Sequence, residues 1–505
     1  MTTLALPAVN PPPLRGLALL APALMVTLVV LPVHYSVTLA EPDLARMMAA
    51  LVYGGVSGLE LDPVTHYGAA FSFGYYQLFY ALVPQEWLRH PDLVARLMNG
   101  FGVFSGILCA CTCAAYLERL YGLRAALAAT TVFFLSPVML PLAFSGHPLV
   151  PAAACLFAGS TLLLSRRWLP ALVLLSLALS FRAEVLLAFP FIALADANGM
   201  PRVWQAALRV LVLAAAFLVF LALQHHYIGD HGGGGLAKLR DFAHSYLNAL
   251  HVGRGAGVLV LATGLASAAL GLLAFVKLRA WQDRALILLL AAPALVFWLP
   301  NPSAARHFFF PVLAACLALA LYAERSARTT LARTLLLAVL VVAANQVIAE
   351  LVRPLIVARY PWSYDSPVAR RAAQRFPIGA FSLDQRANQA FASLERDEAM
   401  QLARQAPRRL LVLAGSDEYF IAQLLARDPQ LRWTESLWNG IYVTELTGGQ
   451  RSIVIVDKAS GWPRDVNAEA LARPEWRELP VYEQRTTVSR YDRTPVPAVR
   501  RFELR

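Results

Sequence analysis

The sequence predicts a polytopic α-helical membrane protein that carries a small soluble α/β domain at its C-terminal end. Of its 505 residues, 58% are hydrophobic and only 15% are charged, and the mean hydropathy is +0.53. These values lie outside the range of ordinary soluble domains. Stretches without Asp, Glu, Lys or Arg recur along the first two thirds of the chain, and a helix needs about 20 such residues to cross a bilayer. They cover residues 16–40, 97–117, 125–165, 210–226, 255–276, 285–305, 307–323 and 334–349.

The stretch 16–40 is expected to remain as the first span. The residues "TLA" before Glu41 loosely fit a signal-peptide cleavage site, but the apolar run is longer than a usual signal sequence contains. Glu41 and Asp43 follow directly, in "LAEPDLARMMAALVYGG". Two interpretations stay open: the acids favour the positive N-terminus of the next helix, or they are reactive groups of a site on the membrane surface.

The segment 61–84, "LDPVTHYGAAFSFGYYQLFYALVP", is polar and rich in aromatic residues. It contains no clean span, so we expect it to return to the membrane surface as a re-entrant or interfacial element. Tyr75 and Tyr76 are typical of interface anchors. His66 is either a loop histidine or a phosphate contact.

The apolar stretch 125–165 is 41 residues long and has "SGHP", with His147, near its middle, so it predicts two spans joined by a tight turn. The segment 168–195 is interrupted by Arg182 and Glu184 in "FRAEV". If the chain turns back there, all short connections that carry Lys or Arg lie on the same side of the membrane as Arg15. An unbroken span would instead move the connection with Arg202 and Arg209, and the two connections after it, to the opposite side. The groups are Arg119/Arg124, Arg166/Arg167, Arg202/Arg209, Lys277/Arg279/Arg284 and Arg325/Arg328/Arg333.

The positive-inside bias therefore favours two half-length pieces, about eleven membrane segments and an extracytoplasmic C-terminus. From Glu350 onward, charge becomes dense. "RRLLVLAG" and "RSIVIVD" are typical of buried strands, and "SDEYFIAQLLARD" is typical of a helix. We expect a transmembrane domain over residues 1–349 and an extracytoplasmic α/β domain over residues 350–505.

The formal net charge of +12 does not indicate nucleic-acid binding, because most of the charges flank apolar stretches or are scattered over the tail. All five cysteines lie in apolar stretches and are expected to be structural thiols, without a disulfide or a metal. His225, His226 and His231 adjoin a flexible "HGGGG" loop and have no acidic or cysteine frame beyond Asp230. We therefore predict no metal site there.

Several segments, taken in order, resemble a known family. They are "AEPDLARMMAALVYGG", "FGYYQLFYALVP", "ARLMNGFGVFSGILCACTCAAYLERLYG", "LAFSGHPLVPAAACLFAGSTLLL", "WLPALVLLSLALSFRAEVLLAFPFIAL" and "NPSAARHFFFPVLAACLALAL". Together they resemble the GT-C glycosyltransferases, nearest to the bacterial group of lipid A aminoarabinose transferases and protein O-mannosyltransferases. The resemblance covers residues 39–321 and is one of order and pattern, without a single invariant motif.

The resemblance implies a multi-pass enzyme of the bacterial inner membrane that uses a polyprenyl-phosphate sugar at the outer face, with membrane lipids as neighbours. It also implies that an acid in the first outer loop acts as the base. The sequence departs from the family in two places: Ala40-Glu41 replaces an adjacent Asp-Glu pair, and His147 in "SGHP" stands near a turn where relatives often carry Asp. The identity of the base and dependence on a divalent cation, Mg²⁺ or Mn²⁺, are therefore open.

Transfer of a sugar requires a carboxylate that takes the proton of the acceptor, and we assign this role to Glu41 or Asp43. The leaving lipid phosphate requires cationic donors. A second set of residues is expected to line the acceptor or sugar pocket. We assign Arg306, His307, Arg182 and His66 to the donor phosphate, and Tyr75, Tyr76 and His147 to the pocket. For Arg182 the structural alternative is a salt bridge to Glu184.

Two other functions compete. In a lipid-glycan flippase or membrane carrier, Arg182 and Glu184 would line a substrate path. In a non-catalytic scaffold, the outward α/β domain would bind a partner. Transporters often pair broken helices from two repeats, and the chain has no second copy of the "FRAEV" hairpin. This favours an enzyme.

Overall fold

The structure of the chain is a computed structural model. It describes two parts of the chain, one helical and one built of strands. The helical part covers residues 72–88, 90–136, 147–197, 200–228, 265–298, 308–325, 333, 336–345 and 347–348. The part built of strands covers residues 409–414, 430–438, 441–448, 451–457, 476–479, 486–488, 495–497 and 500–504.

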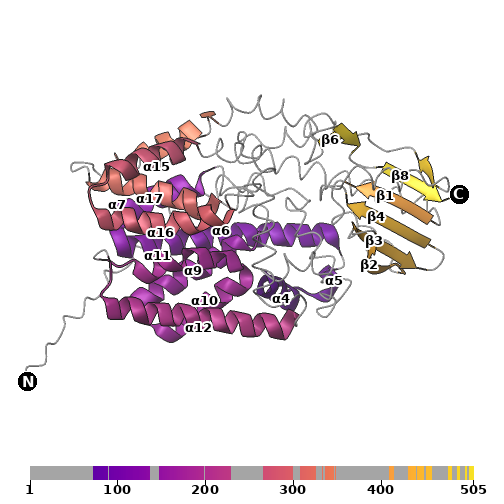
Figure 1. Cartoon of the computed structure of the whole chain (residues 1–505), viewed down its shortest axis with the longest axis horizontal. Coiled ribbons are helices and arrows are strands. Elements are labelled where there is room, and N and C mark those ends of the chain that lie inside the picture. The colour runs from indigo at the N-terminus through magenta and orange to yellow at the C-terminus, as the bar shows by residue number, and fades with distance from the viewer. Residues whose placement is uncertain are drawn as a thin grey trace, which may run out of the picture.

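The first part is a bundle of packed helices (Figure 1). Its elements are α4 (Phe73–Leu82), α5 (Gln85–Leu88), α6 (Pro91–Tyr121), α7 (Leu123–Phe134), α9 (Leu149–Leu164), α10 (Trp168–Phe181), the 3₁₀ helix η4 (Ala183–Ala188), α11 (Phe189–Leu194), α12 (Val203–Ile228), α15 (Leu265–Lys277), α16 (Trp281–Trp298) and α17 (Phe309–Arg325).

Two helices among the described residues are long and apolar enough to cross a membrane: Gly100–Tyr121 within α6 and Val203–His226 within α12. The fold is therefore consistent with the predicted helical membrane protein. α6 ends where Gly122 adopts a φ of 87°, a conformation that favours glycine, and α7 begins at the next residue. The remaining apolar helices are shorter, and the predicted number of eleven membrane segments stays a prediction.

The segment 168–195 is broken at Arg182, which confirms the prediction of two half-length pieces. α10 ends at Phe181, Arg182 is extended with φ −160° and ψ 111°, and η4 and α11 follow. η4 packs against α9, α10 and α11, so the chain folds back on the helices that precede it. At the end of α11, the Nη1 of Arg209 in α12 donates to the carbonyl of Ala195 at 2.6 Å.

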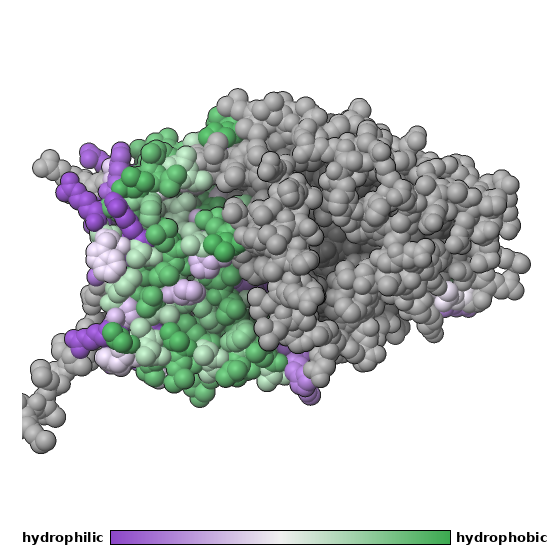
Figure 2. Space-filling view, in the orientation of Figure 1, coloured by the Kyte–Doolittle hydropathy of each residue, from purple (hydrophilic) through white to green (hydrophobic). Residues whose placement is uncertain are grey.

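The arginine-bearing connections meet at one end of the bundle, here called the basic end. Arg119 of α6 donates from Nη1 to Ser165 Oγ at 3.1 Å, and Arg166 lies over the ring of Trp204 at 5.9 Å. These contacts bring together the ends of α6, α9 and α11 and the start of α12. Hydrophilic side chains gather at this end beside a hydrophobic band over the helices (Figure 2).

The last described long helix reaches the same end. Arg325 at the end of α17 donates from Nη2 to Asp283 in the first turn of α16 at 2.9 Å. A Cβ built on Gly122 would lie 3.7 Å from the Oε1 of Glu324, which places α17 beside the α6–α7 turn. The connections at Arg119, Arg166, Arg209 and Arg325 thus meet at one end of the bundle. Their side of the membrane stays a prediction, and Arg15 and Arg328 lie outside the described residues.

α4, in the second half of the segment 61–84, packs onto the bundle, and the predicted return of this segment to the membrane surface stays a prediction. Phe73 stacks on Phe220 of α12 with ring centroids 5.9 Å apart. A Cβ on Gly74 would come within 2.7 Å of the Ser180 Cβ, so glycine is what allows α4 to approach α10 so closely. Leu82 and Trp87, which follow, are exposed. α4 thus covers the end of α10 that lies away from the basic end.

The tail contains a six-stranded sheet in the order β2-β3-β4-β1-β8-β5, drawn in orange and yellow in Figure 1. β1 pairs with β4 in parallel, and the other neighbours are antiparallel. β6 and β7 form a separate two-stranded sheet. The strands are β1 (Arg409–Ala414), β2 (Arg432–Trp438), β3 (Ile441–Gly448), β4 (Arg451–Asp457), β5 (Trp476–Leu479), β6 (Thr486–Val488), β7 (Pro495–Pro497) and β8 (Arg500–Leu504).

β1 and β4 correspond to "RRLLVLAG" and "RSIVIVD", so both predicted strands are confirmed. Their parallel pairing requires a crossover connection, and the predicted helix "SDEYFIAQLLARD" lies between them in the sequence but outside the described residues. All labelled helices precede residue 326 and all labelled strands follow residue 408. The division into domains over residues 1–349 and 350–505 stays a prediction.

Candidate functional site

The candidate site is the broken hairpin at Arg182, at the end of the bundle opposite the basic end. α9 ends and α10 begins at the basic end, so the start of α9 and the end of α10 both point away from it. α10 has 14 residues, and at 1.5 Å per residue it places Arg182 about 21 Å from the basic end. An ionisable residue at this depth of an apolar bundle is a candidate for function.

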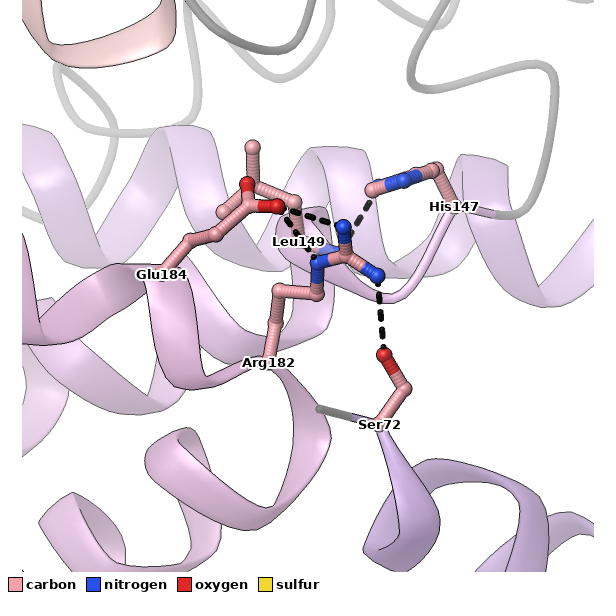
Figure 3. Close-up of polar contacts among 5 residues, drawn as sticks. All are labelled: Ser72, His147, Leu149, Arg182 and Glu184. Carbon is pink, nitrogen blue, oxygen red and sulfur yellow. Dashed lines mark hydrogen bonds and ion pairs between the residues drawn. The ribbon is translucent and has the colours of Figure 1, made fainter. Parts of the chain in front are cut away.

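Arg182 is held by an ion pair and by a hydroxyl group (Figure 3). Its Nε donates to Glu184 Oε1 at 3.1 Å, and its Nη2 donates to the same oxygen. Its Nη1 donates to Ser72 Oγ at 3.1 Å, so the turn before α4 is tied to the hairpin. The salt bridge to Glu184, which was the structural alternative for Arg182, is present.

The pair is largely removed from solvent, since the side chains of Arg182 and Glu184 are 13% and 9% exposed. Two charges in such surroundings are stable only when they are paired and hydrogen-bonded. A guanidinium has five N–H donors, and the three contacts above use one each from Nε, Nη1 and Nη2. Within the described part of the chain, Nη1 and Nη2 each keep one N–H without an acceptor, and these two groups could bind an anion.

His147 lies at the start of α9, on the same end of the bundle as Arg182 (Figure 3). The side chain is buried, and its Nδ1 accepts a hydrogen bond from the backbone N–H of Leu149 at 3.1 Å. In the neutral ring the proton therefore resides on Nε2. His147 stabilises the first turn of α9, which packs against η4, and so helps to fix the wall beside Arg182.

Tyr75 does not lie at the interface, so its interpretation as an interface anchor is wrong. Its ring is buried, 5.8 Å from the ring of Phe101 and 6.1 Å from that of Phe181. Phe181 directly precedes Arg182, so the contact between Tyr75 and Phe181 packs α4 against the residue at which the hairpin turns. Tyr76 is the next residue of α4, and its side chain lies outside the described residues; the pocket role of both tyrosines stays a prediction.

The other predicted site residues lie outside the described residues: Glu41, Asp43, His66, Arg306 and His307. Arg306 and His307 directly precede α17 in the sequence. The first turn of α17 is described, and Phe309 packs edge-on against Phe133 near the end of α7 with centroids 4.9 Å apart. Since α17 ends at the basic end, its first turn lies at the other end of the bundle.

Among the residues that the structure describes, no three His, Cys, Asp or Glu side chains are grouped so that they could hold a metal ion. All five cysteines are free thiols in the structure, and Cys109, Cys113 and Cys316 are buried. His225 and His226 lie in the last turn of α12, and His231 lies outside the described residues.

One partner in the site was missed by sequence reasoning. Ser72 is separated from Arg182 by 110 positions, and it lies in a segment in which the aromatic residues are the more prominent sequence feature. A serine in a loop has no signal that distinguishes a partner of arginine from a solvated hydroxyl. Its role follows only from the way α4 packs on α10.

No protein-family model, curated protein or solved structure matches the chain.

Proposed function

We propose that the chain is a membrane glycosyltransferase of the GT-C type, which moves a sugar from a polyprenyl-phosphate donor to an extracytoplasmic lipid, glycan or protein. The observation that carries this proposal is Arg182 at the end of the bundle away from the basic end, whose largely buried guanidinium keeps two N–H groups that bond to no described residue. The ordered resemblance to GT-C enzymes over residues 39–321 supports the same function.

The orientation follows from the positive-inside rule, because the basic end should face the cytoplasm. In this orientation Arg182 lies toward the outer face. We further propose that about eleven segments cross a bacterial inner membrane, so that the tail lies in the periplasm. With α10 about 21 Å long in a hydrocarbon core of about 30 Å, the guanidinium lies below the outer headgroup plane. A lipid-linked phosphate drawn slightly into the bundle could reach it.

The proposed reaction needs a base and an anion site. Glu41 or Asp43 takes the proton of the acceptor hydroxyl or amine as that atom bonds to the anomeric carbon. The bond between the anomeric carbon and the phosphate oxygen breaks, and polyprenyl phosphate leaves with the electron pair. Arg182, with Arg306 and His307, stabilises its negative charge. Ser72 and Glu184 orient Arg182.

The second candidate is a lipid-glycan flippase or carrier, and the observation that favours it is the same intramembrane Arg182–Glu184 pair. The two functions separate in proteoliposomes that hold a fluorescent polyprenyl-phosphate sugar and an extract of cell-envelope acceptors. A transferase releases polyprenyl phosphate and labels an acceptor, whereas a flippase moves the intact donor across the bilayer and releases nothing. Movement without release would reject the transferase proposal.

A further inference from the structure

The corner between α9 and α10, at the basic end, has an unusual backbone. Arg166 has a φ of 59° and is the one non-glycine residue with positive φ in the described part of the chain. Its N–H bonds to the Leu163 carbonyl at 3.0 Å, and the Arg167 N–H bonds to the Leu162 carbonyl at 2.9 Å. This is a Schellman motif, in which the position of Arg166 usually belongs to glycine. An arginine is strained there, so a purely structural explanation of this residue is weak.

The side chain of Arg166 has a defined place in spite of this strain. Its guanidinium lies over the ring of Trp204, 5.9 Å from the ring centroid, and Trp204 is about half exposed. A guanidinium in a cation–π contact keeps its N–H groups, which can bind two oxygens of a phosphate. The contact therefore places an anion-binding group beside an exposed indole at the bundle surface.

The surroundings of this stack are basic on one side. Arg167 directly follows Arg166, Arg202 lies two positions before Trp204, and both arginines are exposed. In the described part of the chain, Arg166, Arg167 and Arg202 form no ion pair with a carboxylate. The nearby Arg209 does form one, with Asp196 at 3.0 Å. An anion at this corner would thus meet three arginines that are not paired with any described carboxylate.

The surroundings are apolar on the other side. Leu169 and Val173 lie on one face of α10 and are exposed. On α12, Leu211 and Leu218 are exposed and lie seven and fourteen positions after Trp204, on the same face. α10 and α12 pack side by side (Figure 1) and both begin at the basic corner, so apolar side chains are exposed along both helices from that corner.

We propose that the corner formed by Arg166, Arg167, Arg202 and Trp204 binds the phosphate of an anionic phospholipid of the cytoplasmic leaflet, whose acyl chains lie along α10 and α12. An occupant with one acidic headgroup and long acyl chains matches both the charge and the adjoining apolar surface. A soluble anion would match only the positive charge of the corner and would leave the adjoining apolar surface uncovered. The proposal rests on the membrane orientation given above and is independent of glycosyl transfer.

The test uses the full chain, stripped of lipid in a neutral detergent, with phosphatidylglycerol or phosphatidylcholine added back. Bound lipid is counted by native mass spectrometry, and the melting temperature is followed in parallel. We expect the wild type to bind phosphatidylglycerol more tightly than phosphatidylcholine. Arg166→Gly should weaken phosphatidylglycerol binding by about fivefold, the effect of one basic residue at an anionic surface. Inorganic phosphate should not compete at equal concentration.

The variants separate a lipid site from a structural corner. Glycine fits the left-handed position, so Arg166→Gly should melt without lipid at or above the temperature of the wild type. Arg166→Lys keeps the charge but lacks the planar stack, and should bind with intermediate affinity. Arg279→Ala removes an exposed arginine elsewhere at the basic end and should bind as the wild type does. Equal affinity in Arg166→Gly and Arg279→Ala, or equal binding of both lipids by the wild type, would overturn the proposal.

Discussion

Removing the two charges of the Arg182–Glu184 pair, singly and together, should separate a structural from a functional role of Arg182. In Arg182→Met alone, the Glu184 carboxylate loses the guanidinium that faces it, in surroundings where its side chain is only 9% exposed. Breaking a buried pair in this way costs about 3–5 kcal/mol of stability. The double variant Arg182→Met/Glu184→Leu removes both charges and keeps similar volumes, so most of that loss should be recovered.

Donor affinity should behave differently. If Arg182 binds the donor phosphate through its remaining N–H groups, the double variant is stable but still lacks those bonds. Hydrogen bonds to a charged group are worth about 1.5–3 kcal/mol, which corresponds to a loss of roughly 10-fold to 100-fold in affinity. If Arg182 has only a structural role, Arg182→Met/Glu184→Leu should recover both the stability and the donor affinity that Arg182→Met loses.

The assay is binding of a polyprenyl-phosphate sugar to purified variants in nanodiscs, with the melting temperature of each variant recorded. The matched control is the pair Arg209–Asp196 at the basic end, whose side chains are 5% and 24% exposed. Arg209→Met/Asp196→Leu should leave donor affinity unchanged. If Arg182→Met/Glu184→Leu also binds the donor within about twofold of the wild type, a difference below 0.5 kcal/mol, the phosphate role of Arg182 is refuted.

Three further outcomes are expected. Gly74→Ala should lower the melting temperature more than Gly159→Ala, because the new Cβ at position 74 meets the Ser180 Cβ at 2.7 Å, whereas at position 159 it meets the Leu175 side chain at 3.0 Å; equal effects would contradict the tight α4–α10 contact. Arg306→Ala should raise the KM for donor far more than Arg306→Lys, and wild-type KM in both variants would reject its phosphate role. Alkaline phosphatase fused after Arg359 should be active, and an inactive fusion at that point would reverse the proposed topology.

The break at Arg182 was predictable because two independent patterns required it. Charges in "FRAEV" interrupt an apolar stretch, and only a turn at that point keeps the later arginines on one side. β1 and β4 were predictable from short runs of β-branched and leucine residues. In both cases the signal is local or depends on a count of crossings, and a single sequence contains that information.

Contacts between distant segments were not predictable in the same way. Nothing in the sequence joins Ser72 to Arg182, and Tyr75 resembles an interface anchor until α4 is seen to place it between Phe101 and Phe181. The strained backbone of Arg166 was also not predictable, because arginines after an apolar helix are expected at any cytoplasmic connection. These features depend on which helices pack together, and the local sequence pattern of one segment does not contain that information.

The most direct test of the proposed activity is release of polyprenyl phosphate by the purified chain in nanodiscs, supplied with donor and an envelope extract as the source of acceptor. The wild type should release it, and Glu41→Gln or Asp43→Asn should slow the release by roughly 10²-fold to 10⁴-fold at an unchanged melting temperature, as expected for loss of a general base. A wild type that releases no polyprenyl phosphate, or variants that both release it at the wild-type rate, would contradict the catalytic account.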